Sequence, residues 1–264
     1  MYSNAFVAVS WELAHSKGIG YFSSVGHNPK TLKSDKKTDY LTLLQYLAPS
    51  DQAGRGFNVC ASASPGCRRA CLFTSGRGRY DNVQRARKLR TRFWFEHREN
   101  MKACLFDEIR DHVRLCEELD KLPAVRLNGT SDIPWEVVWP KIFEEFPQVS
   151  YYDYTKHWRR LMPTWRLPKN YHLTFSLSET NLEYAEKIMA VNKQANIAVV
   201  FKDELPDKWH GRKVINGDNH DCRLLDGKGV IVGLLAKGRA KSDTSGFVIQ
   251  SHVACKNREL ELVA

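Results

Sequence analysis

Three cysteines lie close together in a polar loop of this 264-residue chain. Cys60, Cys67 and Cys71 have the spacing C-x6-C-x3-C and are surrounded by Gly, Ser, Pro and Arg. The spacing differs from the paired C-x2-C of a structural zinc site. Three thiolates from one loop suit an iron–sulfur cluster, because its iron atoms bind cysteine sulfur. We therefore expect these cysteines to bind a [4Fe–4S] cluster, with the last iron ligated from elsewhere or left open.

A strongly basic stretch contains the cysteine loop and continues beyond it. The chain has a net charge of +10, and residues 55–98 contain eleven Lys and Arg against Asp81 and Glu96, an excess of nine positive charges. Cations there would offset the negative charge of a thiolate-bound cluster. A basic patch is also what a nucleic-acid backbone binds, and a third interpretation is a solvated helix face. Nucleic acid is therefore a candidate partner through residues 55–98.

The length suits one large α/β domain, and we expect a single domain over residues 1–264. Its parts are an N-terminal segment (1–55), the cysteine loop (56–80), a helical region (82–119) and a series of β-α repeats (124–241). Residues 5–14 form a short apolar strand or helix. Residues 39–47 predict a short helix ended by Pro49. Residues 82–119 have helical spacing, as two helices or one bent helix, and place Cys104 and Cys116 on the apolar stripe, where a packing role is expected.

Short runs rich in Val, Ile, Tyr and Phe recur through the second half of the chain. They predict strands over residues 124–128, 149–154, 172–176, 197–201, 213–216 and 230–235. The connections between them are long enough for crossovers, which indicates parallel pairing. The expected fold is therefore α/β, with repeated β-α units in a partial TIM-like barrel or an open parallel sheet, and a helical N-terminal part.

Polar and ionisable residues follow these strands repeatedly. The carboxyl ends of strands are where α/β barrels and open α/β sheets build their sites, so a pocket is expected there. Its candidate residues for substrate contact or proton transfer are Asn128, Asp132, Asp153, Lys156, Ser176, Lys202, Asp218, His220, Asp221 and Lys237.

The densest group among these candidates is His220 with Asp218 and Asp221. It offers an alternative in which the protein is a metal-independent enzyme that uses these residues for acid–base work and the loop cysteines are incidental. Cys222, His220 or an Asp is also a candidate for the fourth cluster ligand. Another alternative is a zinc-bearing, nucleic-acid-binding protein, which needs the same cysteines and the basic stretch.

Four segments of the chain are similar to the phage gene product 88 family. They are NVCASASPGCRRACLFTSGRGR, VQRARKLRTRFWFEHRENM, RLNGTSDIPWE and INGDNHDCRLLDGKGVIVGLLAKGRAKSDTSGFV, spread over residues 58–248. The resemblance implies a phage-encoded intracellular protein with an iron–sulfur site at Cys60, Cys67 and Cys71.

A more distant likeness is to radical S-adenosylmethionine enzymes, which have three cysteines in a loop near the start of a partial α/β barrel. That likeness implies S-adenosylmethionine on an open iron, and it needs an electron donor as partner. This chain departs from the enzymes in its spacing, since they usually have C-x3-C-x2-C, and in the long helical region after its cysteines.

Composition points to a reducing compartment. Seven cysteines, odd in number and clustered, argue against a secreted disulfide framework. The first residues lack the charged and apolar regions of an export signal. No apolar run approaches the ~20 residues needed to cross a bilayer. The expected location is the host cell cytoplasm, without a membrane partner.

Overall fold

The computed structural model describes residues 1–25, 29–71, 73 and 76–250. The chain divides into two compact units. The first unit contains Met1–Ala61, Arg77–Asp153 and Pro168–His172, and the second contains Ser62–Gly76, Tyr154–Leu167 and Leu173–Ala264. The division after residue 61 falls inside the cysteine loop, so Cys60 belongs to the first unit and Cys67 and Cys71 to the second. Cys255, to which the sequence assigns no role, lies outside the described residues.

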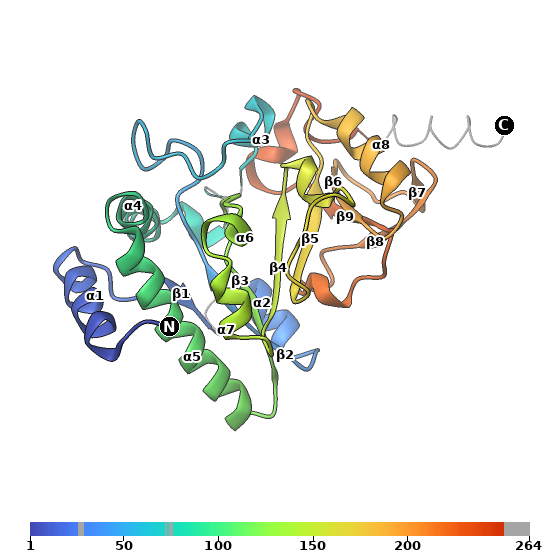
Figure 1. Ribbon diagram of the computed structural model, residues 1–264. Coiled ribbons are helices and arrows are strands. Elements are labelled where there is room, and N and C mark those ends of the chain that lie inside the picture. The colour runs from blue at the N-terminus through green and yellow to red at the C-terminus, as the bar shows by residue number, and fades with distance from the viewer. Residues whose placement is uncertain (26–28, 72, 74–75, 251–264) are drawn as a thin grey trace, which may run out of the picture. The chain divides into compact units, whose positions relative to one another are not determined.

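The strands form one open sheet in the order β1-β2-β3-β4-β5-β6-β9-β8-β7 (Figure 1). Their bounds are β1 Ser23–Ser24, β2 Tyr40–Gln45, β3 Leu122–Arg126, β4 Ser150–Thr155, β5 Tyr171–Ser176, β6 Asn196–Phe201, β7 Lys208–Trp209, β8 Arg212–Asn216 and β9 Ile231–Leu235. Only β1 with β2 and β7 with β8 are antiparallel among the described pairings. The predicted α/β class and the mostly parallel sheet are confirmed. The sheet does not close, since β1 and β7 are its edges.

All six predicted strands are present, as β3, β4, β5, β6, β8 and β9. The helix predicted over residues 39–47 is wrong, because this segment is β2. The last four residues of β2, which include Leu43, are all buried, and β2 lies between β1 and β3 in the sheet. Burial of consecutive residues shows that both faces of β2 are covered, so β2 lacks the alternation of apolar and polar residues that identifies a half-buried strand.

The helices of the first unit are α1 Asn4–Ser16, α2 Pro29–Asp35, α4 Asp81–Glu96, α5 Arg98–Glu118, α6 Trp135–Val138 and α7 Lys141–Glu145. The helical region predicted over residues 82–119 is confirmed as two helices, which break at His97 (φ −137°, ψ 51°). Helix α5 packs against β2 and β3, and α1 and α4 pack against α5 (Figure 1). Cys104 and Cys116 are completely buried on α5, in the packing positions that the sequence predicts.

The second unit contains α3 Pro65–Arg69, α8 Leu182–Val191 and the short 3-10 turns η3 Trp158–Leu161, η4 Arg223–Leu225 and η5 Gly238–Ser242. A further 3-10 turn, η2 Gly76–Arg79, lies before α4, and the division between the units falls after its first residue. One face of β6, with Ile197 and Val199, packs against α8. The other face presents Val200 to a smaller cluster that includes Ala70 and Ala236. Ala70 directly follows α3, so this cluster attaches the short helix of the cysteine loop to the sheet of its own unit.

Candidate functional site

In the first unit, Cys60 lies beside the loop that follows β3. The backbone N–H of Asp132 donates to the carbonyl oxygen of Val59 at 2.8 Å. The Cys60 thiol donates to the carbonyl oxygen of Thr130 at 3.5 Å. The Thr130 hydroxyl in turn donates to the carbonyl oxygen of Leu47, just beyond the end of β2. Cys60 is therefore held at the carboxyl ends of β2 and β3.

The same loop is organised by Asn128, which is almost completely buried. Its side-chain oxygen accepts hydrogen bonds from the Ser131 hydroxyl, the Ile133 N–H and the Trp135 indole. The buried Asp153 carboxylate at β4 accepts from the Asn128 N–H at 2.8 Å and from the Asn128 amide at 3.1 Å. The structure therefore brings Asn128 and Asp153 together, and their hydrogen bonds fix the loop that holds Cys60.

In the second unit, Cys67 and Cys71 are carried by α3 and the residue after its cap. The Ser64 hydroxyl accepts from the Cys67 N–H at 3.2 Å and donates to Glu179 at 2.7 Å. Glu179 follows β5 and also accepts from the Gly66 N–H at 2.6 Å. A Cβ atom at Gly66 would come closer than 3.0 Å to the side chains of Ser245 and Glu179, so a larger residue here would require both side chains to move. The helix is thereby fixed at the carboxyl end of β5.

The other strand-end candidates of the second unit have polar partners within that unit. The Lys156 ammonium donates to the Ser176 hydroxyl at 2.6 Å and lies 5.5 Å from the centre of the Phe247 ring. Asp218 pairs with Lys237 and also accepts the Leu235 N–H at 3.1 Å. The Lys202 ammonium donates to the carbonyl oxygen of Lys241. Lys156, Asp218 and Lys202 therefore each have a polar partner at the strand ends.

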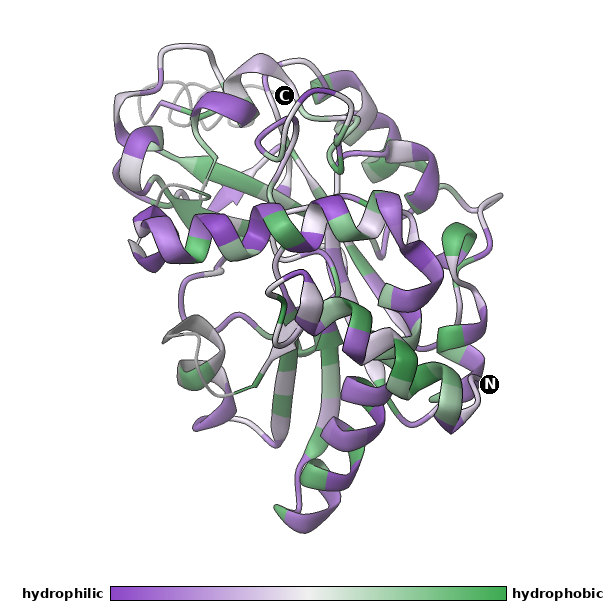
Figure 2. Ribbon diagram, turned by 90° about the vertical axis from the view of Figure 1, so that its left-hand side faces the viewer, coloured by the Kyte–Doolittle hydropathy of each residue, from purple (hydrophilic) through white to green (hydrophobic). Residues whose placement is uncertain are grey.

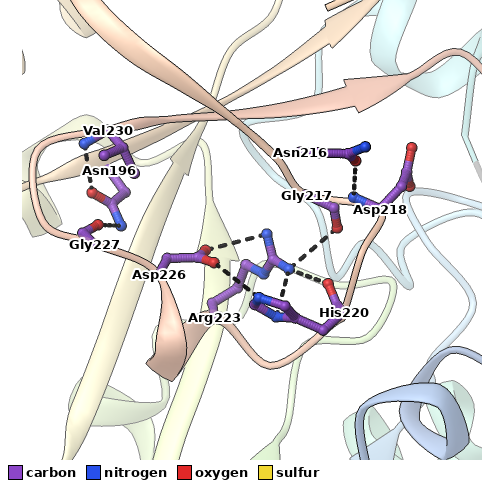
Figure 3. Close-up of polar contacts among 9 residues, drawn as sticks. All are labelled: Asn196, Asn216, Gly217, Asp218, His220, Arg223, Asp226, Gly227 and Val230. Carbon is purple, nitrogen blue, oxygen red and sulfur yellow. Dashed lines mark hydrogen bonds and ion pairs between the residues drawn. The ribbon is translucent and has the colours of Figure 1, made fainter. Parts of the chain in front are cut away.

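His220 has different partners from those expected. Figure 3 shows Arg223 at the centre of the β8–β9 connection, donating to the carbonyl oxygens of Gly217 and His220. Its guanidinium lies 3.2 Å from the Asp226 carboxylate, and the His220 ring lies 3.8 Å from the same carboxylate (Figure 3). Burial raises the pKa of Asp226 to about 6, although the charge of Arg223 opposes the shift. The described contacts join His220 to Asp226, whereas the sequence suggested Asp218 and Asp221 as its acid–base partners.

Burial separates the cysteines into two groups. Cys104, Cys116 and Cys222 are completely buried, and burial raises the pKa of their thiols to about 12, 12 and 11. Cys67 and Cys71 are partly exposed, and Cys60 is 9% exposed. Metal ligation requires the thiolate, which burial in apolar surroundings disfavours. Cys104, Cys116 and Cys222 are therefore poor metal ligands, which makes Cys222 a poor candidate for a fourth one.

The match to known proteins covers most of the fold. A family model described as gene product 88 matches residues 22–251. The chain belongs to the gene product 88 family. The match includes the cysteine loop of this family member and all nine strands of its sheet. No curated protein and no solved structure matches it.

The described residues of this gene product 88 family member contain neither a grouped set of metal ligands nor a membrane-spanning helix. Among its described residues, no three His, Cys, Asp or Glu side chains are grouped so that they could hold a metal ion. Over the same residues, no helix has both the length and the apolar character needed to span a bilayer.

The sequence did not single out three residues that organise these sites. Glu179 lies in the segment SLSET, but its contact to α3 depends on residues more than a hundred positions away. Arg223 and Asp226 follow the predicted His220 group directly, at i, i+3 and i+6. That spacing is a signal, because it places an ion pair next to an ionisable ring.

Proposed function

We propose that this member of the gene product 88 family is an iron–sulfur protein whose loop cysteines Cys60, Cys67 and Cys71 bind a [4Fe–4S] cluster. One observation supports the proposal most directly. In each unit, taken alone, the loop cysteines lie at the carboxyl ends of parallel strands. This is the position where α/β proteins build their sites.

The chemistry of the thiols also supports the proposal. The three loop cysteines are the least buried of the described cysteines, and their spacing within twelve residues brings three sulfurs onto one short segment of chain. Arg68 and Arg69 follow Cys67 directly and are exposed. Their positive charge would offset the negative charge of a thiolate-bound cluster.

The protein's own residues would hold the ligands in place. Glu179 and Ser64 fix the first turn of α3, and the loop around Asn128 fixes Cys60. A bound cluster supplies one-electron chemistry. The finer parts of the proposal are S-adenosylmethionine on an open iron, an electron donor as partner, a partial barrel as scaffold and the host cell cytoplasm as location. The remaining protein candidates for a fourth ligand are His220 or an aspartate.

The test is the content of iron, sulfide and zinc in protein purified without oxygen, together with its absorption spectrum. We expect a brown protein with about four iron and four sulfide per chain. Alanine at Cys60, Cys67 or Cys71 should remove the colour, whereas Cys104→Ala should keep it. Folded protein that stays free of iron after anaerobic reconstitution would overturn the proposal, and zinc in its place would favour the zinc alternative.

S-adenosylmethionine is tested on the same sample. With a reductant present, formation of 5′-deoxyadenosine would support cofactor cleavage at the cluster. If the protein is brown but neither binds nor cleaves S-adenosylmethionine, the cluster part of the proposal stands and the S-adenosylmethionine part is wrong.

A further inference from the structure

Helix α4 has two arginine-bearing faces with different surroundings. On the inner face, the Arg87 guanidinium lies 4.3 Å from the centre of the Tyr46 ring, and that of Arg90 lies 4.4 Å from the centre of the Tyr21 ring. Both arginines are over nine-tenths buried, and Arg90 also donates to the carbonyl oxygen of Tyr21 at 2.8 Å. These two arginines belong to the packing of the first unit, so they are not available to a partner.

The outer face of α4 carries a row of cations. Arg85, Lys88 and Arg92 recur at three- and four-residue intervals, which places them along one side of a helix. Figure 2 shows α4 running across the middle of the view and coloured largely purple. Within the described part of the chain, no carboxylate forms an ion pair with any of the three. Asp81 and Glu96 lie on the same side of α4, one turn before Arg85 and one turn after Arg92, and neither of these described residues forms an ion pair with the row. The row keeps a net positive charge, which attracts a polyanion.

Aromatic rings flank this row. Tyr80, the residue before α4, is 52% exposed, and Phe95 in its last turn is 36% exposed. Arg79 extends the positive charge beyond the first turn, with its guanidinium 5.8 Å from the centre of the Tyr80 ring. Exposed rings beside a row of cations suit unpaired bases, because bases stack on aromatic side chains while the backbone phosphates meet the cations.

We propose that the outer face of α4, together with Arg79 and Tyr80 directly before the helix, binds single-stranded nucleic acid. The cations contact phosphates, and Tyr80 stacks on a base. This surface does not depend on the iron–sulfur proposal, since it uses none of the loop cysteines. The proposal also assigns nucleic-acid binding to one part of the basic stretch of residues 55–98, namely the outer face of α4 and the two residues before it.

The test measures fluorescence anisotropy of a labelled mixed-sequence DNA strand of about 20 nucleotides between 50 and 200 mM salt. The double variant Arg85→Ala, Lys88→Ala should bind at least tenfold more weakly at low salt. Its salt slope should fall by about two, one for each phosphate contact removed. The matched control is Lys36→Ala, Lys37→Ala, which removes the same charge from two exposed positions and should leave the slope unchanged.

Tyr80→Ala separates stacking from charge. We expect it to weaken binding to the single strand about fivefold or more without changing the salt slope, and to leave binding to a duplex of the same sequence unchanged. Absence of binding at 50 mM salt would overturn the proposal. So would equal losses in the α4 variant and the lysine control, or binding only to vesicles of anionic lipid.

Discussion

At the scale of single residues, the surroundings of an ionisable group decide what it does. Asp153 and Asn128 were candidates for substrate contact, yet both are buried and linked by two hydrogen bonds. Buried polar groups need such partners, because an unpaired one costs roughly 1–3 kcal/mol. Their position at a strand end therefore serves the loop that holds Cys60, whatever else binds nearby.

Glu108 on α5 is a second case, and it makes the stability of the chain depend on pH. Its carboxylate accepts the N–H groups of Phe22 and Ser23 at 2.7 and 2.8 Å. Burial nevertheless raises its pKa from 4.5 to about 7, because these hydrogen bonds only partly offset the loss of water. The folded chain therefore binds this proton more tightly than the unfolded chain does.

We expect the proton bound to Glu108 to increase the free energy of unfolding, with its full effect below pH 4.5. This effect is lost as the pH rises through about 7, and it amounts to roughly 3 kcal/mol. Glu108→Gln cannot titrate, so its stability should fall less over the same range. Urea unfolding of both proteins from pH 4.5 to 8 measures the difference. The pH dependence from Asp226 is common to both proteins, and identical slopes would contradict the assignment to Glu108.

At the scale of elements, the five-residue helix α3 depends on contacts from outside itself. A helix this short is marginal alone, since most helical stability in proteins comes from packing. Here Ser64 caps the Cys67 N–H, Glu179 accepts the Gly66 N–H, and Ala70 packs beside Ala236. The position of Cys67 is thus set by residues far away in the sequence.

Glu179→Ala should loosen α3, because it removes the acceptor for Gly66 and Ser64 together. In metal-free protein we expect the Cys67 thiol to be alkylated by iodoacetamide severalfold faster, and the Gly66 amide to exchange with solvent at least tenfold faster. Glu179→Gln keeps one acceptor oxygen and should restore much of the protection. Glu183→Ala, at an exposed position on α8, is the control, and an equal effect there would count against a role for Glu179.

At the scale of the whole molecule, a bound cluster would stabilise the folded chain. A ligand that binds only the folded state at a hundred times its Kd contributes about 2.7 kcal/mol. For a chain of this size, that raises Tm by roughly 5–10 °C. Anaerobic calorimetry of loaded and metal-free protein measures the shift. The Tm shift should be present in Cys104→Ala, because that substitution lowers the Tm of the loaded and the metal-free protein alike. It should be absent in Cys67→Ala. An unchanged Tm shift in Cys67→Ala would exclude the Cys67 thiol as a ligand.

Local sequence patterns were enough to predict the α/β class, the six strands of the second half and the pair of helices over residues 82–119. These are local properties, because hydrophobic period, β-branched content and turn residues act over a few neighbours. Local pattern failed at β2, where Leu43 and Leu44 are buried by elements distant in the chain. It also missed the two-residue strands β1 and β7, which exist only as pairs with longer strands.

Which candidate side chains meet depends on the folded chain as a whole. It assigned Asp153 to Asn128, Lys156 to Ser176 and His220 to Asp226, and it sorted the arginines of α4 into a packed and an exposed face. The sequence shows that a cation or carboxylate is present, but its partner comes from another strand or helix. The physical reason is that pairing and burial depend on distances through space, which the order of residues alone does not fix.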